Sequence, residues 1–410
     1  MGPTTLFDKS FIQSLSTDES VWFDRYFYTA IAPLFYIETL ADLEKKPRSG
    51  KTSEDEVGII AAKTPQMSSV PCYFHRELCL NDLLGHRVPM TGQIPVARAI
   101  KSYRDGKVKV TIKEPEEAKA FIRWQEGRFL EIEREQARDW RSQLARIDLK
   151  LTEMAVEKIG ITVKNCKSLE DAHRMAVGAI ASLAKTYGRF DVFMEMLDVP
   201  KGLRRNIKNR WRSLKRPRLM EFAPYAVFVL TVEIFFSLAV AAKLIASTRQ
   251  SHCVDIAYIF YLPFCNIFIS TDKLHRTCAP FFLRSDQRFI WGSDLKSELA
   301  ELNEYFLTLP LEVRELGIYK FAHRLPVVSN GLIRELYTRY TPSLLEEKAD
   351  ELNNSTRSDL LPGTGDVREQ SGGYDENGEG VDYDELVLHR VVRERKGSWI
   401  QIARAGNQTV

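Results

Sequence analysis

The sequence has no closely paired cysteines. Its six cysteines are scattered from Cys72 to Cys278 without a CxxC pair, which predicts free thiols and argues against a disulfide framework or a common zinc module. The N-terminus, MGPTTLFDKSF, lacks a basic region followed by an apolar stretch, so we expect no secretory signal. These absences predict a reducing, cytoplasmic setting.

A strong charge of either sign is missing as well. The formal net charge is +3 over 410 residues, which is too small to indicate a nucleic-acid or membrane partner by itself. Internal repeats are not found, which argues against a repeat architecture. With 44% hydrophobic residues, the chain can form one large globular domain with insertions, or two to three ordinary domains.

What is present divides the chain into regions of different composition. Residues 1–45 are compact and aromatic, and 46–219 contain a long charged helix that begins near Pro115. In this helix apolar residues such as Trp140 and Leu144 fall three or four apart, which places them on one face. Residues 220–300 are the most apolar part, and short amphipathic helices follow to 352.

The C-terminal region has a different character. The segment 353–385 is rich in Gly, Ser and acids and poor in large apolar residues, which predicts a disordered acidic linker. In 386–410, together with Glu385 just before it, ELVLHRVV and SWIQIARA alternate apolar and polar residues, which predicts a short β hairpin across ERKG, or else a tail.

The stretch DIAYIFYLPFCNIFISTDK carries the clearest structural signal. Its first part, from Asp255 to Leu262, predicts a buried helix that ends at Pro263, and NIFIS predicts an interior parallel strand. Asp272 then lies just past the carboxyl end of that strand, where an open α/β sheet leaves a crevice for ligands. TTLF, followed at once by Asp8, repeats this arrangement near the N-terminus. We therefore expect the two aspartates to meet in one crevice.

Two further acids fit the same geometry. Glu38 lies where the apolar stretch APLFYI passes into a helix, so we expect it in the first turn, and Asp255 starts the helix that leads to the Asp272 strand. Four carboxylates in one cleft repel each other, and their natural counterion is Mg²⁺ or Mn²⁺. For each acid alone, a turn or cap role is the simpler interpretation. The combination predicts a metal site.

LFDKSF, the glutamate of FYIETLADL and the unit DIAYIFYLPFCNIFISTDK together resemble the PIN-domain family of metal-dependent nucleases. The resemblance covers residues 1–45 and the region around 230–290. It implies an α/β fold with a three-layer core, in which 1–45 and 220–300 supply a small parallel sheet flanked by helices. The segment 46–219 is then a large, mainly helical insertion, and 301–352 is a helical extension.

The resemblance also implies an activity, the hydrolysis of phosphodiester bonds, usually in RNA, at an acidic cluster that binds one or two Mg²⁺ or Mn²⁺ ions. Matched by position, the catalytic and metal-binding residues are Asp8, Glu38, Asp255 and Asp272. Ser10 matches the small hydroxyl residue after the first acid and is a candidate for substrate binding. Lys273 and His275 are candidates for phosphate contact, with a solvated loop as the alternative. Family members often dimerise, so a homodimer is a further expectation.

A basic block provides a second candidate for substrate binding. KGLRRNIKNRWRSLKRPR, residues 201–218, holds nine Lys or Arg, no acid and one tryptophan, a composition typical of surfaces that bind single-stranded RNA through phosphates and stacking. Its candidate substrate-binding residues are Arg204, Arg205, Lys208, Arg210, Trp211 and Arg212. A solvated basic helix, or a site for an acidic partner, is the alternative.

Directly after this block, residues 222–242 carry one charge, Glu233, and are long enough to span a bilayer. A charge near the bilayer centre costs on the order of 3 kcal/mol or more, so we expect a buried core helix and no stable membrane insertion. Glu233 then needs either the metal cleft or a basic partner. A membrane-anchored protein and a catalytically inactive PIN-fold nucleic-acid-binding protein are the alternatives to a ribonuclease.

Overall fold

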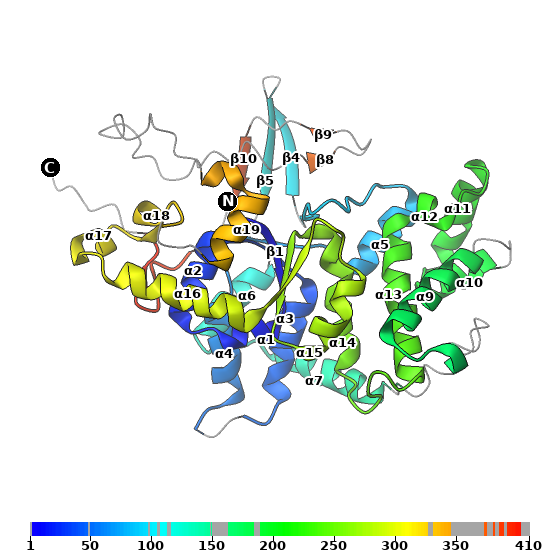
Figure 1. Ribbon diagram of the computed structural model, residues 1–410, viewed down its shortest axis with the longest axis horizontal. Helices are drawn as coiled ribbons and strands as arrows, with labels where there is room; N and C mark the ends of the chain where they lie inside the picture. The colour runs from blue at the N-terminus through cyan, green and yellow to red at the C-terminus, as the bar shows by residue number, and fades with distance from the viewer. Residues whose placement is uncertain are drawn as a thin grey trace.

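In the computed structural model the described residues are 2–47, 50–96, 99–104, 107–112, 116–147, 149, 163–183, 189–326, 331–345, 373–374, 380–381, 385–388 and 392–402. Five parallel strands form the central sheet: β1 (Thr4–Phe7), β2 (Tyr28–Ile31), β3 (Ser69–Pro71), β6 (Ile267–Ser270) and β7 (Arg288–Trp291). Helices flank this sheet on both sides (Figure 1), as parallel sheets require to bury both faces. The expected α/β fold with a small parallel sheet is present.

The strand order is β3-β2-β1-β6-β7. From β1 the chain builds the sheet in one direction through β2 and β3, and later in the other direction through β6 and β7. The central strands β1 and β6 pair directly, with Thr5 opposite Ile267 and Phe7 opposite Ile269. Their carboxyl ends form a topological switch point, where a crevice opens in sheets of this kind. Both strands predicted from the sequence are confirmed.

The helices between β1 and β3 complete the N-terminal half of the core. They are α1 (Lys9–Ser14), α2 (Thr17–Tyr26), α3 (Pro33–Leu40), the 3-10 helix η1 (Ala41–Glu44) and α4 (Ser53–Lys63). Both α4 and β3 lie in the segment 46–219 that the sequence predicts to be an insertion, yet β3 pairs in parallel with β2. The central sheet therefore draws on residues beyond 45.

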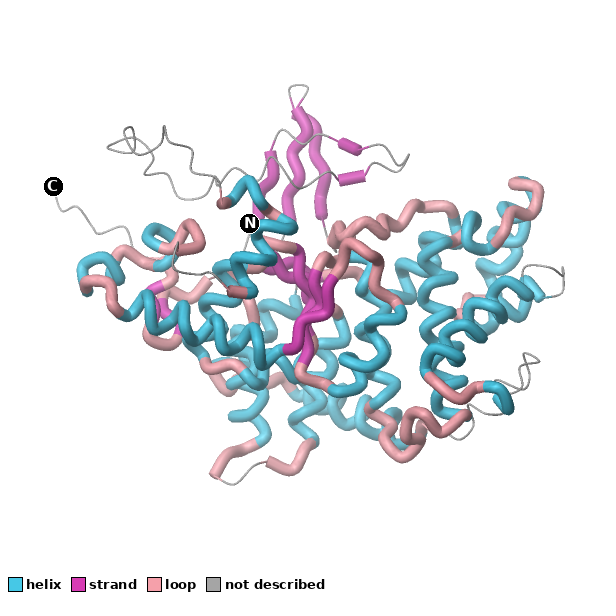
Figure 2. Tube along the Cα trace, viewed as in Figure 1, coloured by secondary structure: helices cyan, strands magenta, loops and turns pink. Residues whose placement is uncertain are grey.

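The chain between β3 and β6 adds a mainly helical body and a small second sheet, shown in magenta above the central one in Figure 2. Its elements are α5 (His75–Leu84), β4 (Ala99–Arg104), β5 (Lys107–Ile112), α6 (Glu116–Gln125), α7 (Glu131–Arg146), η2 (Val163–Asn165), α9 (Leu169–Leu183), α10 (Arg189–Met196), α11 (Lys201–Ser213), α12 (Leu219–Phe222), α13 (Pro224–Ala241), α14 (His252–Ala257) and η3 (Tyr258–Phe264). The prediction of one long helix from near Pro115 is wrong. The chain turns between α6 and α7 at Gly127, whose φ of 69° glycine adopts without steric cost.

The helix α13 corresponds to the apolar run of the sequence. It is long and apolar enough to cross a membrane by length and composition, but 67% of that window is buried inside the protein. It packs against α9 and α5, and side chains along it such as Val227, Leu230 and Phe235 are fully buried. This packing favours the prediction of a core helix over that of a membrane anchor.

The remaining helices lie between β6 and β7 and after β7. They are α15 (Lys273–Cys278), η4 (Ala279–Phe281), α16 (Gly292–Leu307), α17 (Leu311–Glu315), α18 (Ile318–Phe321), α19 (Leu332–Tyr340) and η5 (Pro342–Leu344). The ring of Trp22 in α2 stacks on Phe306 in α16, with centroids 4.3 Å apart. The predicted helical extension is therefore packed against the central domain as far as the described residues reach.

The predicted C-terminal hairpin differs from the observed pairing. The strand β10 (Glu385–Leu388) pairs with β5 instead of with the last segment. A shorter hairpin joins β11 (Arg395–Lys396) to β12 (Trp399–Ile400) and turns at Gly397. Trp399 packs against Trp22 and is 1% exposed. Its burial therefore holds the hairpin against α2. Apart from the short pair β8 (Gly373–Tyr374) and β9 (Gly380–Val381) and the first residue of β10, the predicted disordered linker lies outside the described residues.

Candidate active site

Asp8 and Asp272 follow β1 and β6 at the switch point, as predicted. Each caps the next helix, because Asp8 accepts a hydrogen bond from the Phe11 amide (3.0 Å) and Asp272 accepts one from the Leu274 amide (2.6 Å). Ser270 links the two aspartates, since its hydroxyl donates to Asp8 Oδ2 (2.8 Å) and accepts from the Asp272 amide (2.9 Å). Each aspartate therefore caps a helix, and both also lie at the predicted switch point of the sheet.

A buried histidine holds the Asp8 carboxylate. His275 Nδ1 lies 3.2 Å from Asp8 Oδ2 and 2.8 Å from Ser270 Oγ, while Nε2 lies 2.5 Å from the Asp255 carbonyl oxygen. Burial by itself lowers the pKa of His275, but the hydrogen bond and charge of Asp8 raise it to about 9. Burial likewise acts to raise the pKa of Asp8, but the hydrogen bond and charge of His275, together with the hydrogen bonds from Ser10 and Phe11, outweigh it, so that the pKa is lowered. At neutral pH both groups are charged.

This geometry corrects the prediction for His275. The side chain is 1% exposed and points into the protein, so both the phosphate contact and the solvated loop are wrong. Lys273, two residues before it, is exposed at the start of α15 and does not line the cavity described below. Ser10 donates its hydroxyl to Asp8 Oδ2 (2.7 Å) and accepts one from Thr271 (2.7 Å). It therefore orients the first acid at the wall of the site.

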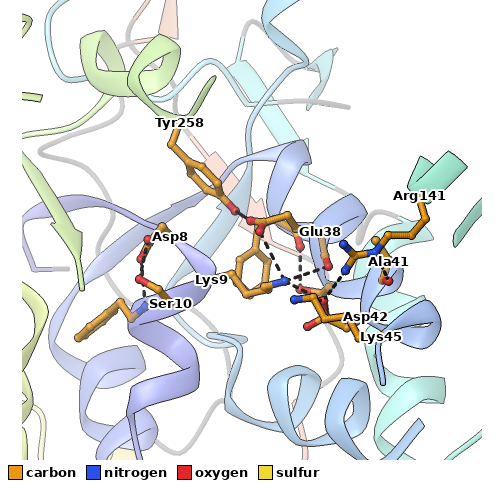
Figure 3. A network of polar contacts seen from close by, with 12 residues as sticks. Asp8, Lys9, Ser10, Glu38, Ala41, Asp42, Lys45, Arg141 and Tyr258 are labelled. Atoms are coloured by element: carbon orange, nitrogen blue, oxygen red, sulfur yellow. Dashed lines mark hydrogen bonds and ion pairs between the residues drawn. The ribbon is translucent and has the colours of Figure 1, made fainter. Parts of the chain in front are cut away.

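Glu38 lies in the last turn of α3, not in its first turn as predicted, because the helix already begins at Pro33. The Tyr258 hydroxyl donates to Glu38 Oε2 (2.7 Å), and Lys9 Nζ lies 3.5 Å from Oε1. Figure 3 shows these contacts continuing from Lys9 to Asp42, at 3.0 Å. Glu38 is thus held from two sides.

Lys9 supplies positive charge inside the acidic region. Burial lowers the pKa of this lysine, but the charges of Glu38 and Asp42 more than reverse the effect, so the pKa is raised. Asp42 also pairs with Lys45 (2.6 Å) and with Arg141 of α7 (3.3 Å). The charge of Asp42 is therefore neutralised within the protein, and the insertion helix α7 is tied to the central domain.

Asp255 lies in the first turn of α14, as predicted. Its Oδ2 is buried and has no hydrogen-bond partner among the described residues. Burial is the main cause that raises the pKa of Asp255 to about 7, and the nearby charges of Glu38, Asp272 and Asp8 add to it, against the charge of His275. A buried carboxylate oxygen that is subject to the negative charges of three other acids needs a proton or a cation.

All four predicted acids line one cavity of about 300 Å³. The other lining residues are Lys9, Ser10, Gln13, Ala41, Lys45, Trp140, Arg141, Leu144, Arg249, Ser251, Val254 and Tyr258. Three of these, Trp140, Arg141 and Leu144, come from α7. The insertion therefore contributes a wall to the site at the strand ends.

The donor set of this cavity suits a hard divalent cation, because carboxylate oxygens are the ligands that Mg²⁺ and Mn²⁺ prefer. The Oδ2 of Asp255, which has no hydrogen-bond partner within the described ranges, fits such an ion. Within the described part of the chain, however, no three acid, histidine or cysteine side chains stand together as a metal-binding group. The charge and ligand type of the acids therefore fit a metal ion. In this structure, however, Asp8 and Glu38 are engaged by donor groups of the protein itself.

The basic block forms α11 at one end of the molecule, beside α10 and α12 and away from α1 and α15 (Figure 1). Trp211 is 4% exposed, and its ring stacks on Phe190 with centroids 4.3 Å apart. The prediction that it stacks on a nucleic-acid base is therefore wrong. Tryptophan at this position completes the local core instead.

Three of the predicted basic contacts are also engaged within the protein. Arg210 donates to the Leu83 carbonyl (3.1 Å), and Arg204 donates to the Val199 carbonyl (2.9 Å). Lys208 pairs with Asp191 at 2.5 Å. Arg205 and Arg212 are exposed on the helix. The observed arrangement corresponds to the alternative of a solvated basic helix with an anchored inner face.

Glu233 is not part of the acidic cavity. Burial raises its pKa to about 7, the charge of Arg76 opposes this shift and that of Asp198 adds to it. Arg76 and Asp198 pair with each other at 3.3 Å. Of the two environments predicted for Glu233, the metal cleft is therefore wrong, and a basic residue is its neighbour.

A second cavity, of about 890 Å³, lies between α9, α13 and η4. Its lining is mainly apolar, with Phe228, Phe281 and Phe282 among the side chains, and Glu221 is its one acid among the described residues. It therefore offers no acidic cluster, and the smaller cavity is the candidate active site.

Sequence reasoning missed the residues that hold the acids, namely Lys9, Tyr258 and Ser270. Ser270 is the last residue of one predicted strand, and Lys9 follows the other strand by two positions, so both positions point to the sheet edge where the acids lie. No local pattern points from Tyr258 to Glu38, which is 220 positions away. Neither a protein-family model, nor a curated protein, nor a solved structure matches the chain.

Proposed function

We propose that this protein is a divalent-metal-dependent nuclease of the PIN-like kind that hydrolyses phosphodiester bonds in RNA. One observation carries the proposal: the four acids singled out in the sequence, Asp8, Glu38, Asp255 and Asp272, line a single cavity at the switch point of a parallel sheet. In open α/β sheets, ligands bind in the crevice at such a point, so acids at the strand ends are placed to contact them.

These four residues would hold Mg²⁺ or Mn²⁺. When bound, such an ion lowers the pKa of a water molecule and neutralises charge on the scissile phosphate. The chain's own groups prepare the acids for this role. His275 keeps Asp8 ionised, and Tyr258 and Lys9 orient Glu38. Asp255 has a buried oxygen that finds no hydrogen-bond partner in the described part of the chain.

The test is cleavage of labelled single-stranded RNA and DNA with Mn²⁺, with Mg²⁺ and with EDTA. We expect cleavage only with metal, and a loss of roughly 100-fold or more in Asp272→Asn, because a metal site supplies several kcal/mol of transition-state stabilisation. Asparagine retains the capping geometry at this position. Asp8→Asn should lose activity as well, with thermal melting as a check on its fold.

Asp139→Asn is the matched control, because Asp139 is an exposed acid of α7 that does not line the cavity. It should cut as fast as the unmodified protein. Equal cleavage by Asp272→Asn and the control, or cleavage that survives EDTA, would contradict the proposal.

A second function, nucleic-acid binding without cleavage, is favoured by a different observation. Lys9 occupies the acidic region as an internal counterion for Glu38 and Asp42, a role that a metal would otherwise share. In that case the protein would bind RNA equally well in EDTA and never cut it. A cytoplasmic location and a homodimer are further parts of our proposal, and the largely buried α13 supports the expectation of no stable membrane insertion.

A further inference from the structure

The helix α7 approaches the acidic cavity through one face. Arg141 Nε donates to the Ala41 carbonyl (2.9 Å) in addition to the contact with Asp42, and this fixes the helix against η1. Trp140 and Leu144 are four positions apart, so they lie one above the other on the same face. Both line the cavity. The insertion therefore places an indole ring beside the acids.

Trp140 differs from four of the other five tryptophans of the chain, and the fifth, Trp291, is half-buried with the Arg276 guanidinium over its ring, 5.0 Å from the centroid. Trp22, Trp124, Trp211 and Trp399 are at most 4% exposed and belong to the hydrophobic core. Trp140 is half-buried, and among the described residues it neither belongs to that core nor packs on it. The aromatic surface of Trp140 therefore lies at the cavity and does not contribute to the hydrophobic core.

The same lining holds a cation that pairs with no carboxylate of the described residues. Lys9, Lys45 and Arg141 are all engaged with Asp42. Arg249 is exposed, precedes α14 and makes no ion pair with any described acid. The cavity therefore joins carboxylates, an aromatic face and an arginine.

We propose that Trp140 stacks on an unpaired nucleobase next to the scissile phosphate, and that Arg249 binds the adjoining phosphate of a single strand. This inference rests on the proposed function and names its substrate class. The cavity, at about 300 Å³, is at the small end of ligand sites and suits one nucleotide unit. Bases inside a duplex are stacked and paired, so they cannot offer a face to Trp140.

The experiment measures binding in EDTA, which separates it from cleavage. The probe is a short fluorescent single-stranded RNA, compared with the same strand carrying abasic ribose units and with its duplex. Trp140→Ala should weaken binding of the normal strand by about 5-fold to 150-fold, since base stacking on an aromatic ring is worth about 1–3 kcal/mol. The abasic strand should bind both proteins equally, and the duplex should bind weakly.

Trp140→Phe retains a ring and should keep most of the affinity. Ile132→Ala is the matched control, because Ile132 lies on the same helix, is 54% exposed and does not line the cavity. Arg249→Gln should lower the slope of log affinity against log salt by roughly 0.7, the value for one phosphate contact on a single strand. Thermal melting checks that each variant folds.

Equal affinity of Trp140→Ala and Ile132→Ala for the normal strand would overturn the inference, as would a wild-type protein that binds no strand. If cleavage occurs but binding ignores Trp140, the nuclease stands and this inference falls. If binding depends on Trp140 and on the base, while no metal supports cleavage, this inference stands and the nuclease falls.

Discussion

Asp8 and His275 form a buried ion pair behind the acidic cavity, with Oδ2 and Nδ1 3.2 Å apart. The two residues come from opposite ends of the domain, and the pairing of β1 with β6 brings them together. The imidazolium keeps the carboxylate ionised in a place where burial alone would favour its protonated form. The candidate site therefore depends on a histidine that does not line it.

We expect His275→Gln to destabilise the protein by about 3–5 kcal/mol near pH 6, because it leaves a buried carboxylate unpaired. The pKa of His275 is raised from 6.5 to about 9, so its contribution is complete below pH 6.5 and is lost as the pH rises through about 9. The pKa of Asp8 is lowered from 3.8, so its share is lost as the pH falls below that value. Urea unfolding at several pH values measures the difference between variant and wild type.

The exposed His323 provides the control for this prediction, since His323→Gln, at the surface, should change stability little. A difference between His275→Gln and wild type that stayed constant from pH 6.5 to pH 9 would contradict the ion pair.

Metal binding should strengthen as the pH rises through about 7. Asp255 has its pKa raised to about 7, so below that value a cation must displace a proton, and above it the carboxylate is already free. Calorimetric titration with Mn²⁺ in buffers of different ionisation enthalpy should detect proton release near neutral pH. Asp255→Asn should bind more weakly and release no proton there. Identical proton release by the variant would rule out this assignment.

Substitutions in α11 should separate packing from charge. Trp211→Ala should lower the free energy of unfolding by about 3–5 kcal/mol, because it opens a cavity in a packed aromatic cluster. Arg205→Glu, on the exposed face, should change stability by no more than about 0.5 kcal/mol. Filter binding of the Arg205 variant to RNA at two salt concentrations tests whether the exposed face of the helix contributes to affinity. An equal loss of stability in both variants would argue against the buried position of the indole.

The core assignment of α13 can be tested at Leu230, which is fully buried. Leu230→Ala should lower the free energy of unfolding by about 2–5 kcal/mol. In a separate experiment, alkaline carbonate should release the wild-type protein from a membrane fraction. Leu214, which is 51% exposed, provides the control, and Leu214→Ala should be nearly neutral. Retention of the wild-type protein in the carbonate-washed membrane pellet would instead support a membrane anchor.

The sequence predicted the two central strands and the acids after them because the signals are local. TTLF and NIFIS are short runs with apolar residues in strand-like order, and Asp8 and Asp272 follow them within two positions. It misplaced Glu38 within its helix because the apolar run before it already belongs to α3. It misread Trp211 because composition does not distinguish the buried face of a basic helix from the exposed one.

The sequence by itself determined the two central strands of the parallel sheet and that Asp8 and Asp272 lie at its carboxyl edge, since hydrophobic pattern and strand termination are properties of neighbouring residues. Only the tertiary structure decided that His275 pairs with Asp8 and that Tyr258 holds Glu38. It also decided that α7 brings Trp140 to the cavity. These contacts join residues that are distant in the chain, and their geometry depends on how whole elements pack, which no local pattern encodes.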